Sequence, residues 1–122
     1  MKKILLADDE PAMRRLVAAT LTDETRFEIL HAADGHEALD MARAERPAVL
    51  LLDVNMPGLN GYQVCRALKD DPATADIVIF MLTANSRPED QEEGLAAGAD
   101  AYFRKPFSPL ALLEQIEAVL EE

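Results

Sequence analysis

Apolar and polar positions along the chain alternate in blocks that are typical of repeated strand-helix units. Apolar runs of strand length lie near residues 3–7, 27–32, 49–53, 77–82 and 100–104, and a helical pattern follows each of them. Strands that alternate with helices form a parallel sheet, because each helix carries the chain back to the edge where the strands begin. The sequence therefore predicts an α/β fold with a doubly wound sheet of five parallel strands.

The helices are predicted near residues 11–21, 35–45, 60–69, 88–97 and from 109 onward. The spacing of apolar positions on the first helix indicates one buried stripe. That stripe would consist of Met13, Leu16, Val17, Thr20 and Leu21. The second helix follows a turn at Asp34-Gly35, whose Asp side chain can cap it. On the last helix we expect five side chains to face inward: Leu112, Leu113, Ile116, Val119 and Leu120.

The helix predicted at 88–97 differs from the others because little of it is apolar. Its apolar content is Leu95, Ala96 and Ala97. A helix that buries little apolar surface is held weakly and opens at a low free energy. We therefore expect this helix to be a moving part of the fold.

Charged residues stand at the ends of three predicted strands. Asp53 ends the central apolar run, Asp8-Asp9-Glu10 follows the first strand, and Lys105 follows the fifth. The carboxyl ends of the strands in an open α/β sheet form the crevice where ligands bind, so we expect these groups to converge. By its position alone, Asp53 fits equally well a loop residue that caps the next helix.

The predicted cluster of carboxylates suits a divalent cation. Adjacent Asp side chains repel each other unless a cation lies among them. Oxygen ligands with water in the remaining positions are what Mg²⁺ prefers, and Mn²⁺ accepts similar ligands. A carboxylate beside such a metal could also accept a phosphoryl group.

Four motifs, in this order, resemble those of the receiver domain of bacterial two-component response regulators. They are Asp8-Asp9, Asp53 with Met56-Pro57-Gly58, Thr83-Ala84 and Lys105-Pro106-Phe107. The resemblance covers essentially the whole chain and implies one receiver domain, residues 1–122, with a flavodoxin-like (βα)5 fold and strand order 2-1-3-4-5. It implies a signalling switch and not an enzyme, since such a domain promotes only its own phosphorylation and dephosphorylation.

The resemblance also assigns roles to the matched residues. Asp53 would accept a phosphoryl group from a phosphohistidine on a histidine kinase or a histidine phosphotransfer protein. Asp8, Asp9, Asp53 and the backbone carbonyl of Asn55 would hold Mg²⁺, with Asp8 acting largely through water. Lys105 would contact a phosphoryl oxygen.

The family carries a threonine and an aromatic switch, and Thr83 and Tyr102 stand at the matching positions. Thr83 would hydrogen-bond the phosphoryl group, and Tyr102 would turn inward as the threonine moves. The phosphorylated state would thereby change the face formed by the fourth helix, the fifth strand and the fifth helix. A downstream protein or an output domain would read that face.

We also assign hypothetical roles in loss of the phosphoryl group and in partner docking to two further sets of residues. Asn55 and Asn85 lie two residues after Asp53 and Thr83, where their side chains would flank the approach of a hydrolytic water and permit loss of the phosphoryl group. Partner docking is expected at a rim formed by Pro11, Met13, Arg14, Pro106 and Phe107. Met13 is equally well interpreted as a core residue.

Three alternatives belong to other functional classes or lack the switch. A phosphatase of the haloacid dehalogenase type also uses an aspartate nucleophile with Mg²⁺, but it needs a second Asp where this chain has Asn55. A flavodoxin-like flavin binder needs a hydroxyl- and glycine-rich phosphate loop after the first strand, where Asp8-Asp9 would repel phosphate. A receiver-like binding module that is never phosphorylated is the third alternative.

Composition limits the classes of binding partner and the cellular location that we expect for this protein. The formal net charge of −11 argues against direct nucleic-acid binding, which needs a concentrated basic surface. The N-terminal apolar stretch is too short for a signal peptide or a membrane span, so we expect a cytoplasmic protein with no membrane association. A single cysteine, Cys65, cannot form an internal disulfide and is predicted to be a core residue.

The expected oligomeric state follows from charges that this chain lacks. DNA-binding response regulators of the winged-helix type usually pair charges between two copies of the fourth helix, fifth strand and fifth helix. Here the corresponding residues are Gln91, Glu93, Ala101, Ala111 and Gln115. Most of the basic partners are missing, so we expect a monomer.

Overall fold

The computed structural model of the chain describes residues 2–22, 27–83, 88–104 and 108–120. Five parallel strands form one sheet in the order β2-β1-β3-β4-β5, which confirms the predicted fold class. The elements along the chain are β1 (Lys2–Ala7), α1 (Pro11–Thr22), β2 (Phe27–Ala32), α2 (Gly35–Glu45), β3 (Val49–Asp53), α3 (Gly61–Lys69), β4 (Val78–Thr83), α4 (Pro88–Ala96), β5 (Ala101–Arg104) and α5 (Pro109–Leu120).

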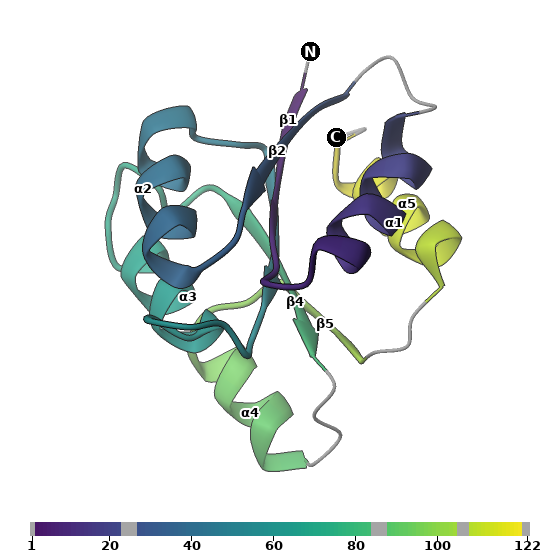
Figure 1. The fold of residues 1–122 in the computed structure, drawn as a ribbon. Coiled ribbons are helices and arrows are strands. Elements are labelled where there is room, and N and C mark those ends of the chain that lie inside the picture. The colour runs from purple at the N-terminus through teal and green to yellow at the C-terminus, as the bar shows by residue number, and fades with distance from the viewer. Residues whose placement is uncertain (1, 23–26, 84–87, 105–107, 121–122) are drawn as a thin grey trace.

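Helices cover both faces of the sheet. Helices α2, α3 and α4 lie on one side and α1 and α5 on the other (Figure 1). Side chains on a strand alternate between the two faces, so Leu50 and Leu52 of β3 join the core under α2 and α3. Val49 and Leu51 join the core under α1 and α5. The central strand is therefore apolar without interruption because neither of its faces meets water.

The pairing register brings the polar strand ends to one edge. Ala7 of β1 lies opposite Leu52 of β3, so the residues that follow them, Asp8 and Asp53, lie side by side. Asp53 itself pairs with Leu82 of β4, one residue before Thr83. The carboxyl edge of the sheet thus brings together Asp8, Asp53 and Thr83.

The second and third helices begin at side-chain caps. The Asp34 carboxylate accepts a hydrogen bond from the Glu37 N–H at 2.8 Å, as the sequence predicted. Asn60 and Gln63 form a reciprocal pair in which each side chain accepts from the other residue's N–H. These contacts satisfy amide groups that a helix N-terminus otherwise leaves without partners.

The predicted stripe of α1 was wrong at Leu16. Val17 and Leu21 are buried, but half of the Leu16 surface is exposed (50%). Helix α1 meets the core through side chains four residues apart, and Met13, at the start of this row, is half-buried against the core. Leu16 instead lines an apolar groove between α1 and α5, together with Leu110 and Leu113.

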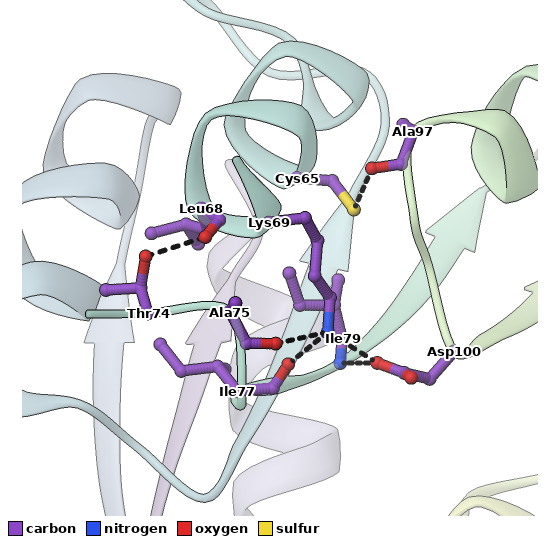
Figure 2. Close-up of polar contacts among 9 residues, drawn as sticks. All are labelled: Cys65, Leu68, Lys69, Thr74, Ala75, Ile77, Ile79, Ala97 and Asp100. Carbon is purple, nitrogen blue, oxygen red and sulfur yellow. Dashed lines mark hydrogen bonds and ion pairs between the residues drawn. The ribbon is translucent and has the colours of Figure 1, made fainter. Parts of the chain in front are cut away.

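A polar network ties the opposite edge of the sheet together (Figure 2). The Lys69 ammonium at the end of α3 donates to the carbonyls of Ala75 (3.1 Å) and Ile77 (2.7 Å) and to the Asp100 carboxylate (3.1 Å). The same Asp100 oxygen accepts from the Ile79 N–H at 2.8 Å. One lysine and one carboxylate therefore link α3, the start of β4 and the turn before β5.

Cys65 is a core residue, as predicted. Its side chain is fully buried, and its thiol donates to the carbonyl of Ala97 at 3.4 Å (Figure 2). Burial raises the pKa of the Cys65 thiol from 9.0 to about 11, with Lys69 opposing the shift and Asp100 adding to it. The thiol is therefore protonated in the folded protein at neutral pH.

Replacing Asp100 by Ala should destabilise the fold. The variant removes the acceptor of the Ile79 N–H and one acceptor of Lys69. Because the Asp100 side chain is partly exposed, we expect a loss of about 1–2 kcal/mol in unfolding free energy, measured by urea denaturation. Asp76→Ala removes the same charge from an exposed position nearby and should change stability by less than about 0.5 kcal/mol. Equal losses in the two variants would contradict a specific role for Asp100.

The buried thiol should make stability fall at high pH. Above the ordinary pKa of 9.0 the unfolded chain releases the Cys65 proton, whereas the folded protein keeps it up to about 11. Stability should therefore decline through this range, by about 2–3 kcal/mol in total. Comparison with Cys65→Ala cancels the titration of other groups. The stability gap between wild type and variant should narrow from about pH 8 to about pH 10.5, and a constant gap would contradict the prediction.

Candidate functional site

Asp53 lies at the carboxyl end of the central strand and is nearly buried. Only 3% of its surface is exposed, and its Oδ1 accepts from the Asn55 N–H at 3.3 Å. The next residue, Val54, donates its N–H to the Leu82 carbonyl of β4 at 3.0 Å. The sheet pairing therefore continues past the carboxylate, which holds the Asp53 backbone in place.

Asp8 lies beside it at the end of β1 and is equally buried. Its N–H donates to the Ala32 carbonyl of β2 at 3.1 Å, and its Oδ1 accepts from the Glu10 N–H at 2.9 Å. The carbonyl of Asp8 accepts from the Arg14 guanidinium at 2.6 Å. Arg14 thus braces the turn between β1 and α1.

Three consecutive acids form a group that could hold a cation. Carboxylate oxygens of Asp8, Asp9 and Glu10 all lie within 4.8 Å of one another, and Asp9 and Glu10 are exposed. Asp53 is not a member of this group and reaches the same edge through the strand register. The oxygen donors and their open side fit a hard divalent cation that keeps part of its water shell.

Glu10 belongs to this acidic group, although none of the four sequence motifs includes it. It was recognised only as a neighbour of Asp8 and Asp9, because three successive acids after a strand do not reveal which of them face one another. The turn after β1 decides which acids face one another. The Glu10 N–H donates to the Asp8 carboxylate, which keeps Glu10 close to the end of the strand. The sequence signal for Glu10 was its position directly after Asp8 and Asp9.

The loop after Asp53 is held by a close approach of Gly61. A Cβ atom at Gly61 would lie 2.6 Å from the carbonyl oxygen of Asp53 and 2.8 Å from the Cα of Val54. The Gly61 N–H also donates to the Val54 carbonyl at 2.9 Å. Any side chain at Gly61 would therefore push the backbone that carries the Asp53 carboxylate.

Thr83 and Tyr102 lie on neighbouring strands and on the same face of the sheet. Met81 pairs with Tyr102, and Thr83 follows Met81 by two residues, so all three side chains point to one side. Thr83 is fully buried. Tyr102 packs against the core under α2 and α3, whereas its neighbour Phe103 packs against Phe80 on the other face.

Three residues of the predicted docking rim lie within the described part of the chain. Pro11 is exposed, Arg14 is half-buried, and Met13 is half-buried against the core. A small pocket between α1 and the strand ends is lined by Asp8, Met13 and Arg14, with the apolar residues Leu6, Ala7, Val17, Leu51 and Leu82. The remaining assigned residues, Asn85, Lys105, Pro106 and Phe107, lie outside the described residues.

No helix in the described part of the chain combines the length and apolar content needed to cross a membrane.

Comparisons with known proteins agree with this geometry. A transcriptional regulator described as probable ycf27 from Porphyridium aerugineum is 43% identical over 119 residues, which are 98% of this chain and 48% of the relative. The chain thus spans about half the length of the curated relatives it matches. The chemotaxis protein CheY4 of Vibrio cholerae is 39% identical, with a TM-score of 0.88 and 98% coverage of both chains. A BeF3-activated DrrB receiver domain is 31% identical, with a TM-score of 0.88, and the match covers 100% of this chain and 99% of that one.

The family match covers nearly all of the described fold. Residues 4–117 match the family described as the response regulator receiver domain, from the first strand into the last helix. The fold of CheY4 and the acidic edge of the sheet agree with that match. This chain belongs to the response regulator receiver domain family.

Proposed function

We propose that the chain acts as a phosphorylation-dependent switch in which Asp53 is the phosphoacceptor. The observation that carries this is the position of a nearly buried carboxylate at the carboxyl end of β3, beside the acids that follow β1. Carboxylates at neighbouring strand ends repel one another, and a bound cation would relieve this repulsion. Membership of the receiver family supports phosphoryl transfer as the class of chemistry. The positions of the site residues support Asp53 as the acceptor.

The proposed donor is a phosphohistidine on a histidine kinase or phosphotransfer protein. A carboxylate oxygen of Asp53 attacks the phosphorus, the phosphorus–nitrogen bond breaks, and the imidazole nitrogen leaves with the electron pair. The Asn55 N–H donates to Oδ1 of Asp53 and so helps to orient the carboxylate. Positioning and charge neutralisation dominate such a transfer because the charge resides on the peripheral phosphoryl oxygens. Lys105 is proposed to neutralise one of them.

Mg²⁺ or Mn²⁺ is the proposed cofactor. Asp8, Asp9, Asp53 and the Asn55 carbonyl would hold it, and Glu10 extends the carboxylate group. When bound, the ion would offset negative charge on the transferring phosphoryl group. The chain's own contribution is to bring two buried carboxylates to neighbouring strand ends, where their mutual repulsion favours cation binding.

The proposed output is a change of the face formed by α4, β5 and α5. A phosphoryl group on Asp53 would recruit the Thr83 hydroxyl, and Tyr102, on the same face of the sheet, would respond to that movement. The BeF3-activated form of the related DrrB receiver supports a state of this kind. A downstream protein or output domain in the cytoplasm would read the face, and we propose that the chain remains a monomer without direct nucleic-acid contact.

Incubation with acetyl phosphate and Mg²⁺ tests the acceptor directly. Intact-mass measurement should show the gain of one phosphoryl group, which chelation of the metal prevents and hydroxylamine removes, because acyl phosphates are cleaved by that nucleophile. Asp53→Asn should show no gain. Asp76→Asn makes the same chemical change at an exposed position and should be phosphorylated like the wild type. Phosphorylation of Asp53→Asn to the wild-type extent would contradict the assignment.

A second test concerns the lifetime of the phosphorylated state. Asn55 is exposed beside the Asp53 carboxylate, and Asn85 is proposed to flank the same approach path. Replacing both by Leu should exclude the attacking water and lengthen the half-life severalfold, since a barrier increase of about 1 kcal/mol slows hydrolysis roughly fivefold. Gln115→Leu changes an exposed amide on α5 and should leave the half-life unchanged. An unaltered half-life in the double variant would refute the hypothesis.

A further inference from the structure

Among the α4 positions whose burial is described, 89 and 92–96, the buried one is a glycine. Leu95 is 53% exposed and Ala96 is exposed, whereas Gly94 is buried. The small number of apolar residues in α4 predicts weak packing. The structure adds that the buried surface of α4 at this turn is glycine backbone.

Two aromatic rings lie against Gly94, one from each neighbouring element. A Cβ atom at Gly94 would lie 3.1 and 3.2 Å from Cδ2 and Cε2 of Tyr102 on β5. It would lie 3.5 Å from Cε1 of Tyr62 on α3. Carbon atoms pack best about 3.5–4.0 Å apart, so an added methyl group would fit against Tyr62 but crowd Tyr102.

Packing, and not hydrogen bonding, holds the Tyr102 ring under α4. Its hydroxyl is buried, and no partner for it exists within the described part of the chain. A buried hydroxyl without a partner opposes the inward position, while burial of the ring favours it. The orientation of Tyr102 is therefore a balance that a small steric change can tip.

The helix cannot easily move aside at its C-terminal end. The Cys65 thiol donates to the carbonyl of Ala97, and Asp100, just beyond the helix, bonds to Lys69 and Ile79 (Figure 2). Between these anchors, Gly98 adopts a φ of +101°, which side-chain-bearing residues rarely adopt. A methyl group on Gly94 would thus displace the Tyr102 ring more readily than it displaces this end of the helix.

We propose that Gly94 is a positioning residue for Tyr102: the missing Cβ provides the space in which the ring lies inward. This inference deepens the proposed switch, because it names the contact through which the face of α4 and the ring of Tyr102 depend on each other. It rests on the proposed function only for its consequence in signalling. The steric relation between Gly94 and Tyr102 can be measured in the unphosphorylated protein.

The direct test measures the exposure of the Tyr102 ring. The chain has two tyrosines and no tryptophan. In a Tyr62→Phe background, Tyr102 is therefore the only side chain that fluoresces more strongly than phenylalanine. Adding Gly94→Ala to this background should raise the quenching constant for iodide roughly twofold, as the ring population shifts outward. Ala96→Gly alters helix propensity at an exposed position of the same helix and should leave quenching unchanged.

A double-mutant cycle separates crowding from helix propensity. Alanine favours a helix over glycine, so Gly94→Ala in a Tyr102→Ala background should raise the urea midpoint by roughly half a molar. With Tyr102 present the same change should raise it less or lower it, because the ring must be displaced first. Unchanged quenching together with equal midpoint shifts in both backgrounds would overturn the proposal.

The cycle remains decisive if the single variant fails to fold. Rescue of folding by Tyr102→Ala would support the crowding of the ring, and failure of both variants would overturn the proposal. These measurements need neither metal nor phosphoryl donor. A negative result in the acetyl phosphate experiment would therefore reject the proposed function and leave the Gly94–Tyr102 contact to be judged by its own data.

Discussion

Burial of β3 on both faces is the constraint on which the rest of the structure depends. The strand pairs with β1 on one side and β4 on the other, so its backbone groups are satisfied only while both neighbours stay in register. Its side chains meet two separate cores, and a polar residue within the strand would be buried wherever it pointed. The chain can therefore place a carboxylate on this strand only at its end, which is where Asp53 lies.

The two edges of the sheet have different physical roles. At the carboxyl edge, Asp8 and Asp53 are brought together although like charges repel, and backbone N–H groups of Glu10 and Asn55 partly compensate them. At the opposite edge the ion pair of Lys69 with Asp100 satisfies carbonyl and amide groups of several connections.

Helix α4 connects the carboxyl edge of the sheet, where β4 ends, with the opposite edge, where β5 begins. Its C-terminal end is tied to α3 and β4 through Asp100 and Cys65, and its middle rests on two tyrosine rings. Such a helix can shift its outer turns without losing much buried apolar surface, because it has little to lose. The proposed switch requires this property of the α4 face.

The sequence by itself determined the class of fold and the placement of chemistry along the chain. Uninterrupted apolar runs identified the buried strands, and caps such as Asp34 marked helix starts, because both signals depend on residues close in the chain. The resemblance of four motifs then assigned roles to Asp53 and its neighbours. Only the tertiary structure decided that Leu16 faces a groove, that Glu10 joins the acidic group, and that Gly94 lies against Tyr102. These facts depend on which distant element covers each position, and local periodicity does not identify that element.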